Sequence, residues 1–298
     1  MNTDLFGNKV EQSVLLRDKF IEPPFSVLRA DSGEWQNRKK NWINIGIKGE
    51  VGRDKSLLGY SKSCERYMDS HKTYKNLGKD SGESDYTSVF DPALTELIYK
   101  WFCPDNGNVL DPFAGGSVRG VVANYLGLKY TGIELREEQV KSNEEQARTI
   151  LAPENQPEWI TGDSEKVLDV LDFQYDFIFS CPPYLDLEVY SDIPEDLSTM
   201  DFKAFMKKYD SIIGKALNLL KKDRYACFVV GDVRDKQGFY CCFPDMTKMC
   251  FLNHGAKLYN EAVLLNPVAS ASMRADKQFS ANKKLFKIHQ NVLIFKKL

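Results

Sequence analysis

The sequence predicts an α/β fold built on a doubly wound, mostly parallel sheet of seven strands. From about residue 90 onward, short apolar segments typical of buried strands alternate with longer helical segments. Turns rich in glycine or proline follow two of these strands directly. With 298 residues, 43% of them hydrophobic, the chain can bury one full α/β core and still carry an appendage.

The individual elements follow from local signals. Asp91 and Pro92 begin the first helix, because Asp caps free backbone amides and Pro suits the first turn. Gly127 and Gly255 lie where helices are expected to stop. Apolar residues recur at helical spacing between residues 201 and 222. The expected helices span 93–102, 117–127, 136–151, 164–171, 201–222 and 245–256, and the expected strands span 108–110, 129–135, 158–164, 175–184, 224–233, 257–265 and 289–297.

The first 85 residues have a different character, and we expect a separate basic segment there, followed by the α/β domain over 86–298. Pro23 and Pro24 interrupt a weakly helical stretch, and WQNRKKNWINIGIKGEVGR shows no clean period. The polar stretch 75–88 is typical of a linker or loop.

Charge is unevenly distributed although the net charge is only -2. Residues 35–80 and 271–298 each have a balance of +6, whereas residues 131–176 have a balance of -8. This separation favours a polyanion-binding face on a cofactor-binding body, although ordinary solvated surface would also explain it.

Several classes of protein are excluded. The sequence contains no run of 18 apolar residues, so it predicts no membrane span, and its N-terminal residues lack the apolar core of a signal peptide. The seven cysteines contain no CxxC pair and the three histidines are scattered, which argues against a disulfide framework or a structural zinc site. We therefore expect no metal and a reducing cytoplasm.

Polar and glycine residues follow three successive predicted strands. The turn from Asp111 to Ser117 contains Gly115 and Gly116, which allow a ligand to approach the backbone at the start of a helix. Glu134 ends the next strand, where a carboxylate can bind a ribose diol, and Asp163 ends the third, where it can bind an adenine amine. The pattern predicts an adenosine-containing cofactor, while the glycine spacing does not match the dinucleotide fingerprint. Asp111 as a simple turn residue and Glu134 as a helix cap are the alternatives.

A second turn, from Ser180 to Tyr184, follows a strand expected to lie beside the first. Pro182 and Pro183 end the strand and leave carbonyls directed outward, with an aromatic ring beside them. Such a corner can accept hydrogen bonds from both N–H groups of the exocyclic amine of a base while Tyr184 stacks on the ring. These hydrogen bonds localise the nitrogen lone pair and direct it at an electrophilic methyl group.

These residues resemble the S-adenosylmethionine-dependent DNA amino-methyltransferases, which act on adenine N6 or cytosine N4. DPFAGG is similar to the D-P-F-x-G-x-G turn of the family, SCPPY to its [DNS]-P-P-[YF] motif, and FDPALTELIYKW to the helix that helps hold the methionine end. The resemblance covers about residues 90–298 and favours phage and prophage members. It implies a class I, Rossmann-like methyltransferase with S-adenosylmethionine as its cofactor. The implied cofactor-binding residues are Phe90, Asp111, Pro112, Phe113, Ala114, Gly115, Gly116, Ser117, Glu134, Leu135, Asp163 and Ser164, and the implied catalytic residues are Ser180, Cys181, Pro182, Pro183 and Tyr184.

Two positions depart from the family pattern. Ser117 replaces the final glycine of the cofactor turn. Cys181 occupies the acceptor position, and because a thiol is a poor acceptor, either Ser180 or the Pro182 carbonyl has to take its place. Cys181 also leaves open a covalent attack on cytosine C5. The target base is therefore undecided, with adenine slightly favoured.

A base inside a duplex cannot reach such a corner, so the substrate is flipped or single-stranded DNA. We expect the N-terminal 85 residues and the loop 267–287 to bind DNA, with Trp35 and Trp42 available to stack. A loop containing LEVYSDIPEDLS, with Asp186 and Glu188 nearby, is expected to form a lid that also caps the next helix. The candidate phosphate contacts are Arg38, Lys39, Lys40, Arg274, Lys277, Lys283 and Lys284.

Three other functions remain open: methylation of RNA or of a protein glutamine, an NAD-dependent oxidoreductase, and a non-catalytic DNA-binding relative. The oxidoreductase would leave the diproline corner unexplained. A homodimer and a partner restriction enzyme are both compatible with the sequence. The expected location is the cytoplasm of a bacterial or phage-infected host cell.

Overall fold

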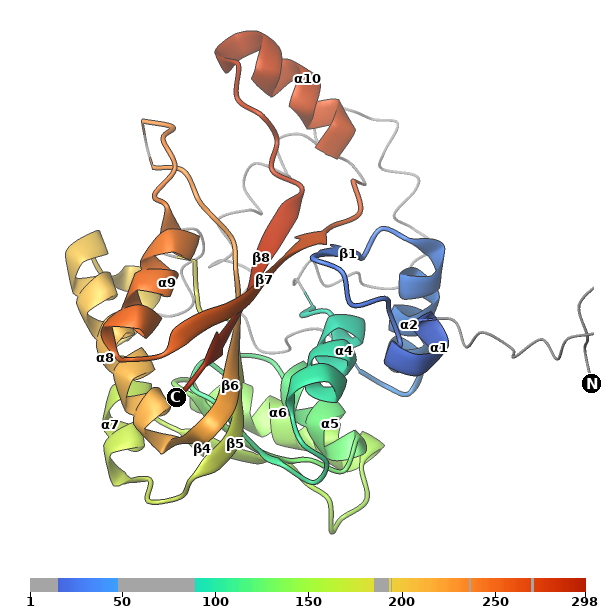
Figure 1. Ribbon diagram of the computed structural model, residues 1–298, viewed down its shortest axis with the longest axis vertical. Coiled ribbons are helices and arrows are strands. Elements are labelled where there is room, and N and C mark those ends of the chain that lie inside the picture. Colours follow the sequence, from blue (N-terminus) through green and yellow to red (C-terminus); the bar gives the residue numbers. More distant parts are fainter. Residues whose placement is uncertain (1–15, 48–88, 185–192, 194, 236, 269–270) are drawn as a thin grey trace, which may run out of the picture.

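The computed structural model describes residues 16–47, 89–184, 193, 195–235, 237–268 and 271–298. Its centre is one eight-stranded sheet with the strand order β1-β7-β8-β6-β5-β2-β3-β4 (Figure 1). Only β8 runs antiparallel to its neighbours, β6 and β7. The strands are β1 (Val27–Arg29), β2 (Asn108–Asp111), β3 (Lys129–Glu134), β4 (Glu158–Thr161), β5 (Tyr175–Ser180), β6 (Leu220–Val230), β7 (Lys257–Leu265) and β8 (His289–Lys296). The predicted mostly parallel α/β sheet is confirmed.

The sheet has one strand more than the seven predicted. Val27–Arg29 pairs in parallel with Val263–Leu265 of β7 and forms the edge of the sheet. The segment has only three residues, of which only Leu28 is buried, and three residues are too few to show the alternation by which a strand is predicted.

Helices cover both faces of the sheet, as a doubly wound fold requires. One apolar cluster joins α2, α4, α5 and α6 to the sheet, and a second joins α7, α8 and α9 to the opposite face. The helices are α1 (Leu16–Phe20), α2 (Gly33–Asn44), α4 (Pro92–Phe102), α5 (Val118–Tyr125), α6 (Glu137–Ile150), α7 (Ser164–Val170), α8 (Phe202–Leu219), α9 (Phe243–Asn253) and α10 (Ala271–Asn282), with a 3-10 turn η2 (Leu197–Thr199).

The predicted start of α4 is confirmed in detail. Asp91 Oδ1 accepts hydrogen bonds from the backbone N–H groups of Ala93 and Leu94 at 2.9 and 3.2 Å, with Pro92 as the first helical residue. Gly127 and Gly255, at the ends of α5 and α9, have φ values of +80° and +84°, which few other residues adopt.

The helix α2 was not expected from the sequence, and it corrects the role suggested for two tryptophans. Trp35 and Trp42 are buried, so they are not available to stack on DNA. Their indole N–H groups donate to Asp91 Oδ2 at 3.1 Å and to Glu96 Oε2 at 2.8 Å, which fixes α2 on α4. Residues 16–47 are thus part of the folded core. The expected boundary at residue 85 and the expected linker 75–88 lie outside the described residues, which resume at residue 89.

Within the described ranges, no helix combines the length and the apolar character that crossing a bilayer requires. The same ranges contain six of the seven cysteines, all of them free.

Candidate active site

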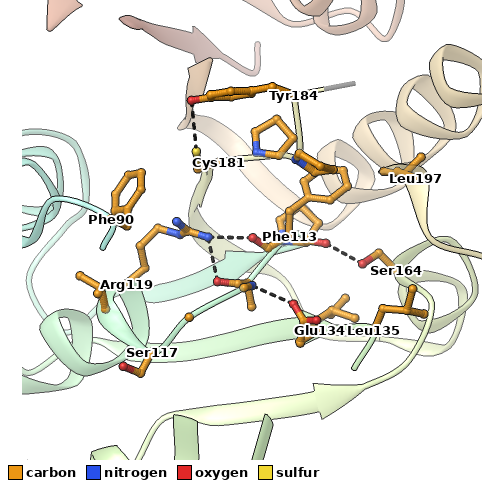
Figure 2. Close-up of a pocket in the computed structure, with 18 of the residues that line it drawn as sticks. Phe90, Phe113, Ser117, Arg119, Glu134, Leu135, Ser164, Cys181, Tyr184 and Leu197 are labelled. Atoms are coloured by element: carbon orange, nitrogen blue, oxygen red, sulfur yellow. Dashed lines mark hydrogen bonds between the residues drawn. The ribbon is translucent and has the colours of Figure 1, made fainter. Parts of the chain in front are cut away.

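A cavity of about 470 Å³ opens at the carboxyl ends of the central strands, and both predicted turns line it (Figure 2). The glycine turn contributes residues 112–117, and the diproline corner contributes Cys181, Pro182, Pro183 and Tyr184. Because β2 and β5 are neighbours in the sheet, their carboxyl ends deliver the two turns to the same place. The two turns therefore face one common cavity.

The glycine turn is tied to the elements beside it. Gly115 has a φ of +52°, and its N–H donates to Glu134 Oε2 at 3.0 Å. Its carbonyl accepts from Asn143 Nδ2 of α6 at 2.8 Å, and Ala114 N donates to the Ile133 carbonyl at 3.0 Å. These bonds hold the turn against β3 and α6.

Glu134 is positioned by the backbone on both sides. Besides the bond from Gly115, its Oε1 accepts from Arg136 N at 3.0 Å, and the buried Arg136 guanidinium lies 3.5 Å away. The alternative interpretation of Glu134 as a helix cap is wrong, because Arg136 is the N-cap of α6 and no side chain caps that helix; Glu134 instead binds the chain just before the helix and lines the cavity. An oriented carboxylate at this position can accept hydrogen bonds from a diol.

Asp163 has two structural partners in addition to lining the cavity. Its Oδ1 caps α7 by accepting from Glu165 N at 3.1 Å, and its Oδ2 lies 3.1 Å from Lys208 Nζ of α8. Lys208 also donates to the Glu195 carbonyl at 2.9 Å. The neighbouring Ser164 Oγ donates to the Pro112 carbonyl at 2.5 Å, so the ends of β2 and β4 are joined across the cavity floor.

Asp111, predicted as a cofactor-binding residue, is fully buried beneath the turn and does not line the cavity. It accepts from Arg119 Nε at 2.6 Å, Tyr130 OH at 2.8 Å, Ser180 Oγ at 2.5 Å and Phe113 N at 3.1 Å. A carboxylate with four donors is bound too completely by protein groups to contact a ligand directly. Asp111 therefore supports the turn from below.

Arg119, the buried ion-pair partner of Asp111, was not predicted from the sequence. Its guanidinium donates to the carbonyls of Phe113 and Ala114 and lies 4.6 Å from the centre of the Phe90 ring. Burial lowers the pKa of Arg119, but the charge of Asp111 outweighs this and the pKa is raised. The cation thus stays charged and fixes the outline of the turn beside Phe90, which lines the cavity.

At the second corner, Ser180 is fully buried and directed at Asp111, so it lies outside the cavity. Tyr184 is held by several contacts. Its hydroxyl lies 3.5 Å from Cys181 Sγ and accepts from Gln290 Nε2 of β8 at 3.1 Å. A side chain at Gly231 would lie 3.3 Å from the Tyr184 ring, which shows how closely the ring approaches the end of β6.

The predicted DNA-binding residues fall into separate environments. Arg38 pairs with Glu96 at 3.0 Å, and Lys39 lines the cavity 3.7 Å from Asp91. Lys40, Lys277 and Lys283 are exposed, and Lys284 is half-buried. The loop 267–287 contains an unpredicted helix, α10, which projects from the same end of the molecule as the cavity-forming strand ends (Figure 1).

Other predictions fall on positions that the structure leaves undescribed. These are the Arg274 side chain, Asp186, Glu188 and most of the predicted lid. The cap of α8 is described: it is Asp201, whose Oδ1 accepts from Ala204 N at 2.9 Å.

Some cavity residues were not predicted, because they belong to no recognisable motif and come from distant parts of the chain: Arg119, Arg136, Lys208, Leu264, Asn266 and Gln290. The cavity is also lined by residues from segments singled out in the sequence, namely Lys39, Asp91, Pro267 and, from the predicted lid, Glu195, Asp196 and Leu197. In the described ranges, no group of three or more potential metal ligands gathers.

The donors and acceptors fit the adenosine cofactor expected from the sequence. The turn 112–117 presents backbone next to the start of α5, Glu134 presents an oriented carboxylate, and Asp163 lies at the third strand end. All three line the same cavity in the order in which their strands lie in the sheet.

Comparisons with known proteins agree with this arrangement. A family model described as DNA methylase matches residues 8–145, which include the glycine turn and Glu134 and end before the diproline corner. The predicted similarity to DNA amino-methyltransferases is thus confirmed over these residues, whereas the phage-type assignment stays a prediction. No curated protein matches the chain by sequence.

Solved structures of methyltransferases resemble the chain at low identity. TrmN from Thermus thermophilus has a TM-score of 0.49 and 15% identity, with 70% of this chain and 49% of TrmN covered. Magnesium protoporphyrin IX methyltransferase from Synechocystis PCC 6803, with bound SAM, has a TM-score of 0.42 and 12% identity, covering 90% and 93%. A candidate DNA modification methylase, also from Thermus thermophilus, has a TM-score of 0.33 and 16% identity, covering 45% and 50%.

Proposed function

We propose, from the DNA methylase match over residues 8–145 and the site geometry, that the chain transfers a methyl group from S-adenosylmethionine to a DNA base. The acceptor is an exocyclic amino group, with adenine N6 slightly favoured over cytosine N4. The observation that carries this proposal is that the glycine turn and the diproline corner line one cavity of about 470 Å³. Pockets of roughly 300–1,000 Å³ are typical of small-molecule sites.

The cofactor half of the cavity is formed by residues 112–117, Glu134 and Asp163. Bound there, S-adenosylmethionine supplies an electrophilic methyl group. Glu134 accepts hydrogen bonds from the ribose hydroxyls, since its orientation is already set by Gly115 N and Arg136 N. Phe90, beside the Arg119 guanidinium, covers the methionine end.

The target base enters at the second corner. Tyr184 stacks on its ring, and the Pro182 carbonyl accepts a hydrogen bond from an N–H of the amino group. Because Ser180 is bonded to Asp111 outside the cavity, the acceptor role falls to the proline carbonyl and not to the Ser180 hydroxyl. Hydrogen bonding to the amine directs the nitrogen lone pair at the methyl group. Formation of the nitrogen–methyl bond would break the methyl–sulfur bond, and the methylated, cationic nitrogen would then lose its extra proton to water, so the corner needs no strong base.

The DNA itself is bound by the basic surface around the cavity mouth. Of the residues proposed from the sequence, Lys40, Lys277 and Lys283 are exposed and available for phosphates. Lys39 is closer to the reacting groups, because it lines the cavity.

The test is a transfer assay with tritium-labelled S-adenosylmethionine and separate DNA, RNA and protein acceptors, followed by nucleoside mass spectrometry. We expect label in DNA as N6-methyladenine or N4-methylcytosine. Label in 5-methylcytosine would instead assign a covalent role to Cys181, which also lines the cavity. Label only in RNA or in glutamine, or cofactor binding without any transfer, would overturn the proposed function.

A further inference from the structure

A β-hairpin connects β6 to α9 and has no role in the function proposed above. Its two arms are joined by a bridge between Arg234 and Tyr240, by a hydrogen bond from Asp235 N to the Phe239 carbonyl at 2.8 Å, and by one from Cys241 N to the Val233 carbonyl at 2.9 Å. We call residues 231–235 and 237–242 the 231–242 hairpin; residue 236 lies outside the described residues. It rises at the end of the molecule where α10 also lies (Figure 1).

Both ends of the hairpin contact Tyr184, the residue proposed to stack on the target base. At the first end, the backbone of Gly231 lies so close that a Cβ there would be 3.3 Å from the Tyr184 ring. Just past the second end, Phe243 packs edge-on against Tyr184 with 6.4 Å between ring centres. A strand whose base lies on Tyr184 must therefore pass beside this hairpin.

The outer surface of the hairpin combines cations with aromatic rings. The Arg234 guanidinium lies 3.7 Å from the centre of the Tyr240 ring, and Lys287 Nζ lies 5.9 Å from the same centre. Lys284 reaches Gly238, where a Cβ would collide with its Nζ. Phe239 is 69% exposed and Tyr240 is 41% exposed, so both rings are accessible to a binding partner.

The two described acids of the hairpin are turned toward backbone amides. Asp235 Oδ1 accepts from the N–H groups of Gln237, Gly238 and Phe239 at 2.7 to 2.9 Å. Asp232 Oδ1 accepts from Val233 N and Phe243 N. Burial lowers the pKa of Lys287 despite the opposing effect of Asp232, so a phosphate beside Lys287 would favour its charged form.

We propose that the 231–242 hairpin, together with Lys284 and Lys287, binds the DNA strand next to the target base. Arg234, Lys284 and Lys287 contact phosphates, and Phe239 stacks on an unpaired base. Cations that follow the backbone and exposed rings that stack on bases are the combination by which proteins bind single-stranded nucleic acid. This inference rests on the proposed function and adds the 231–242 hairpin to the DNA-binding segments expected from the sequence, which are the N-terminal residues and the loop 267–287.

The test measures binding of the full chain to a fluorescein-labelled, mixed-sequence single-stranded DNA by fluorescence anisotropy over a range of salt concentrations. For the double variant Arg234→Gln/Lys287→Gln we expect the plot of log affinity against log salt concentration to become less steep by about 1.4. Each lost phosphate contact on a single strand contributes about 0.7 to this steepness. For Phe239→Ala we expect affinity to fall roughly 5- to 150-fold with the salt slope unchanged, because stacking is lost and no charge is removed.

The matched control is Lys129→Gln/Phe173→Ala, which removes a cation and a 49%-exposed aromatic ring at the amino ends of β3 and β5, away from the cavity. Its DNA affinity should equal that of the wild type. All variants should keep the wild-type affinity for S-adenosylmethionine, which shows that the cofactor site is intact.

Wild-type DNA affinity in both hairpin variants, or no DNA binding by the wild type, would overturn the inference. The methyl-transfer assay separates this from a failure of the proposed function. If the hairpin variants lose DNA affinity while the wild type transfers no methyl group, the hairpin inference stands and the catalytic proposal fails.

Discussion

Ser180 Oγ donates a hydrogen bond to Asp111 Oδ1 at 2.5 Å, and this bond joins the last residues of two neighbouring parallel strands, β5 and β2. The same oxygen of Asp111 accepts from Phe113 N at 3.1 Å, at the start of the glycine turn. One buried carboxylate oxygen thus binds both Ser180, which precedes the two prolines by two residues, and the backbone N–H of Phe113 in the glycine turn. The separation of the two corners is therefore set by a contact that lies beneath the cavity.

Ser180→Ala tests whether Ser180 supports the site or acts in it. Removing the hydroxyl leaves Asp111 with the donors Arg119, Tyr130 and Phe113, and we expect the free energy of unfolding to fall by about 1–3 kcal/mol. Methyl transfer should continue at a reduced rate, because Ser180 does not line the cavity. Urea unfolding and initial-rate assays check this. Loss of all transfer with unchanged stability would instead show that Ser180 contacts the base.

Glu134→Gln tests the ribose contact. The amide keeps the size of the side chain but removes the negative charge, and hydrogen bonds to charged groups contribute about 1.5–3 kcal/mol. The dissociation constant for S-adenosylmethionine, measured by calorimetry, should therefore rise roughly 10- to 150-fold. The control is Glu144→Gln, which removes an exposed partner of Arg148 on α6 and should leave the affinity unchanged. An unchanged affinity in Glu134→Gln would remove Glu134 from the cofactor site.

Arg119→Lys tests whether the buried guanidinium positions the glycine turn. Lysine keeps the charge but lacks the planar fork that contacts Asp111, Phe113 and Ala114 together. We expect cofactor affinity to fall about tenfold, equivalent to about 1.4 kcal/mol, along with a lower Tm. Arg148→Lys, in an exposed pair with Glu144, is the control and should change neither. A lower Tm with wild-type cofactor affinity would limit Arg119 to a role in stability.

Tyr184 variants separate its ring from its hydroxyl. Tyr184→Ala should raise KM for DNA roughly 5- to 150-fold, the range for losing one base-stacking contact, without changing cofactor affinity. Tyr184→Phe keeps the ring and loses only the contacts with Cys181 and Gln290, so most activity should remain. Steady-state kinetics with DNA as the varied substrate distinguish the two. Full activity in Tyr184→Ala contradicts stacking on this ring.

The sequence predicted those parts of the fold and site whose signals are local. A strand followed at once by Gly115–Gly116 or by Pro182–Pro183 places a turn at a strand end, and the parallel sheet then brings the two turns together. The cap at Asp91 is equally local, because a side chain bonds to amides two and three residues away.

What the sequence did not predict depends on contacts between distant residues. Gln290 meets Tyr184 across 106 positions, and Lys208 meets Asp163 across 45. The helix α2 is fixed by indole hydrogen bonds from Trp35 and Trp42 to α4, which join residues 56 and 54 positions apart, so no local pattern indicates that the two rings are buried. Such tertiary contacts leave no periodic pattern in the chain.

Asp176 provides a test of how charge stabilises the sheet at its amino end. Its Oδ1 lies 2.8 Å from Lys221 Nζ, and its Oδ2 accepts from Asn108 N and Asn108 Nδ2, both at 3.1 Å, so it joins β2, β5 and β6. Burial alone would raise the pKa of Asp176, but the bonds from Lys221 and Asn108 outweigh it, and the pKa lies below its ordinary value of 3.8.

A carboxylate with a depressed pKa in the folded state stabilises the fold above its unfolded pKa, and that contribution is lost as the pH falls through the folded value. Asp176→Asn should therefore lower the free energy of unfolding by about 1–3 kcal/mol at pH 7. The gap from the wild type should begin to close as the pH falls below the ordinary value of 3.8, where the unfolded carboxylate takes up a proton, and should narrow further at lower pH as the folded carboxylate is protonated. Urea unfolding between pH 7 and pH 3 measures the gap, with Asp169→Asn at an exposed pair with Lys215 as the control. A gap that stays constant over this range would mean that Asp176 acts through its shape and hydrogen bonds, which Asn retains in part, and not through its charge.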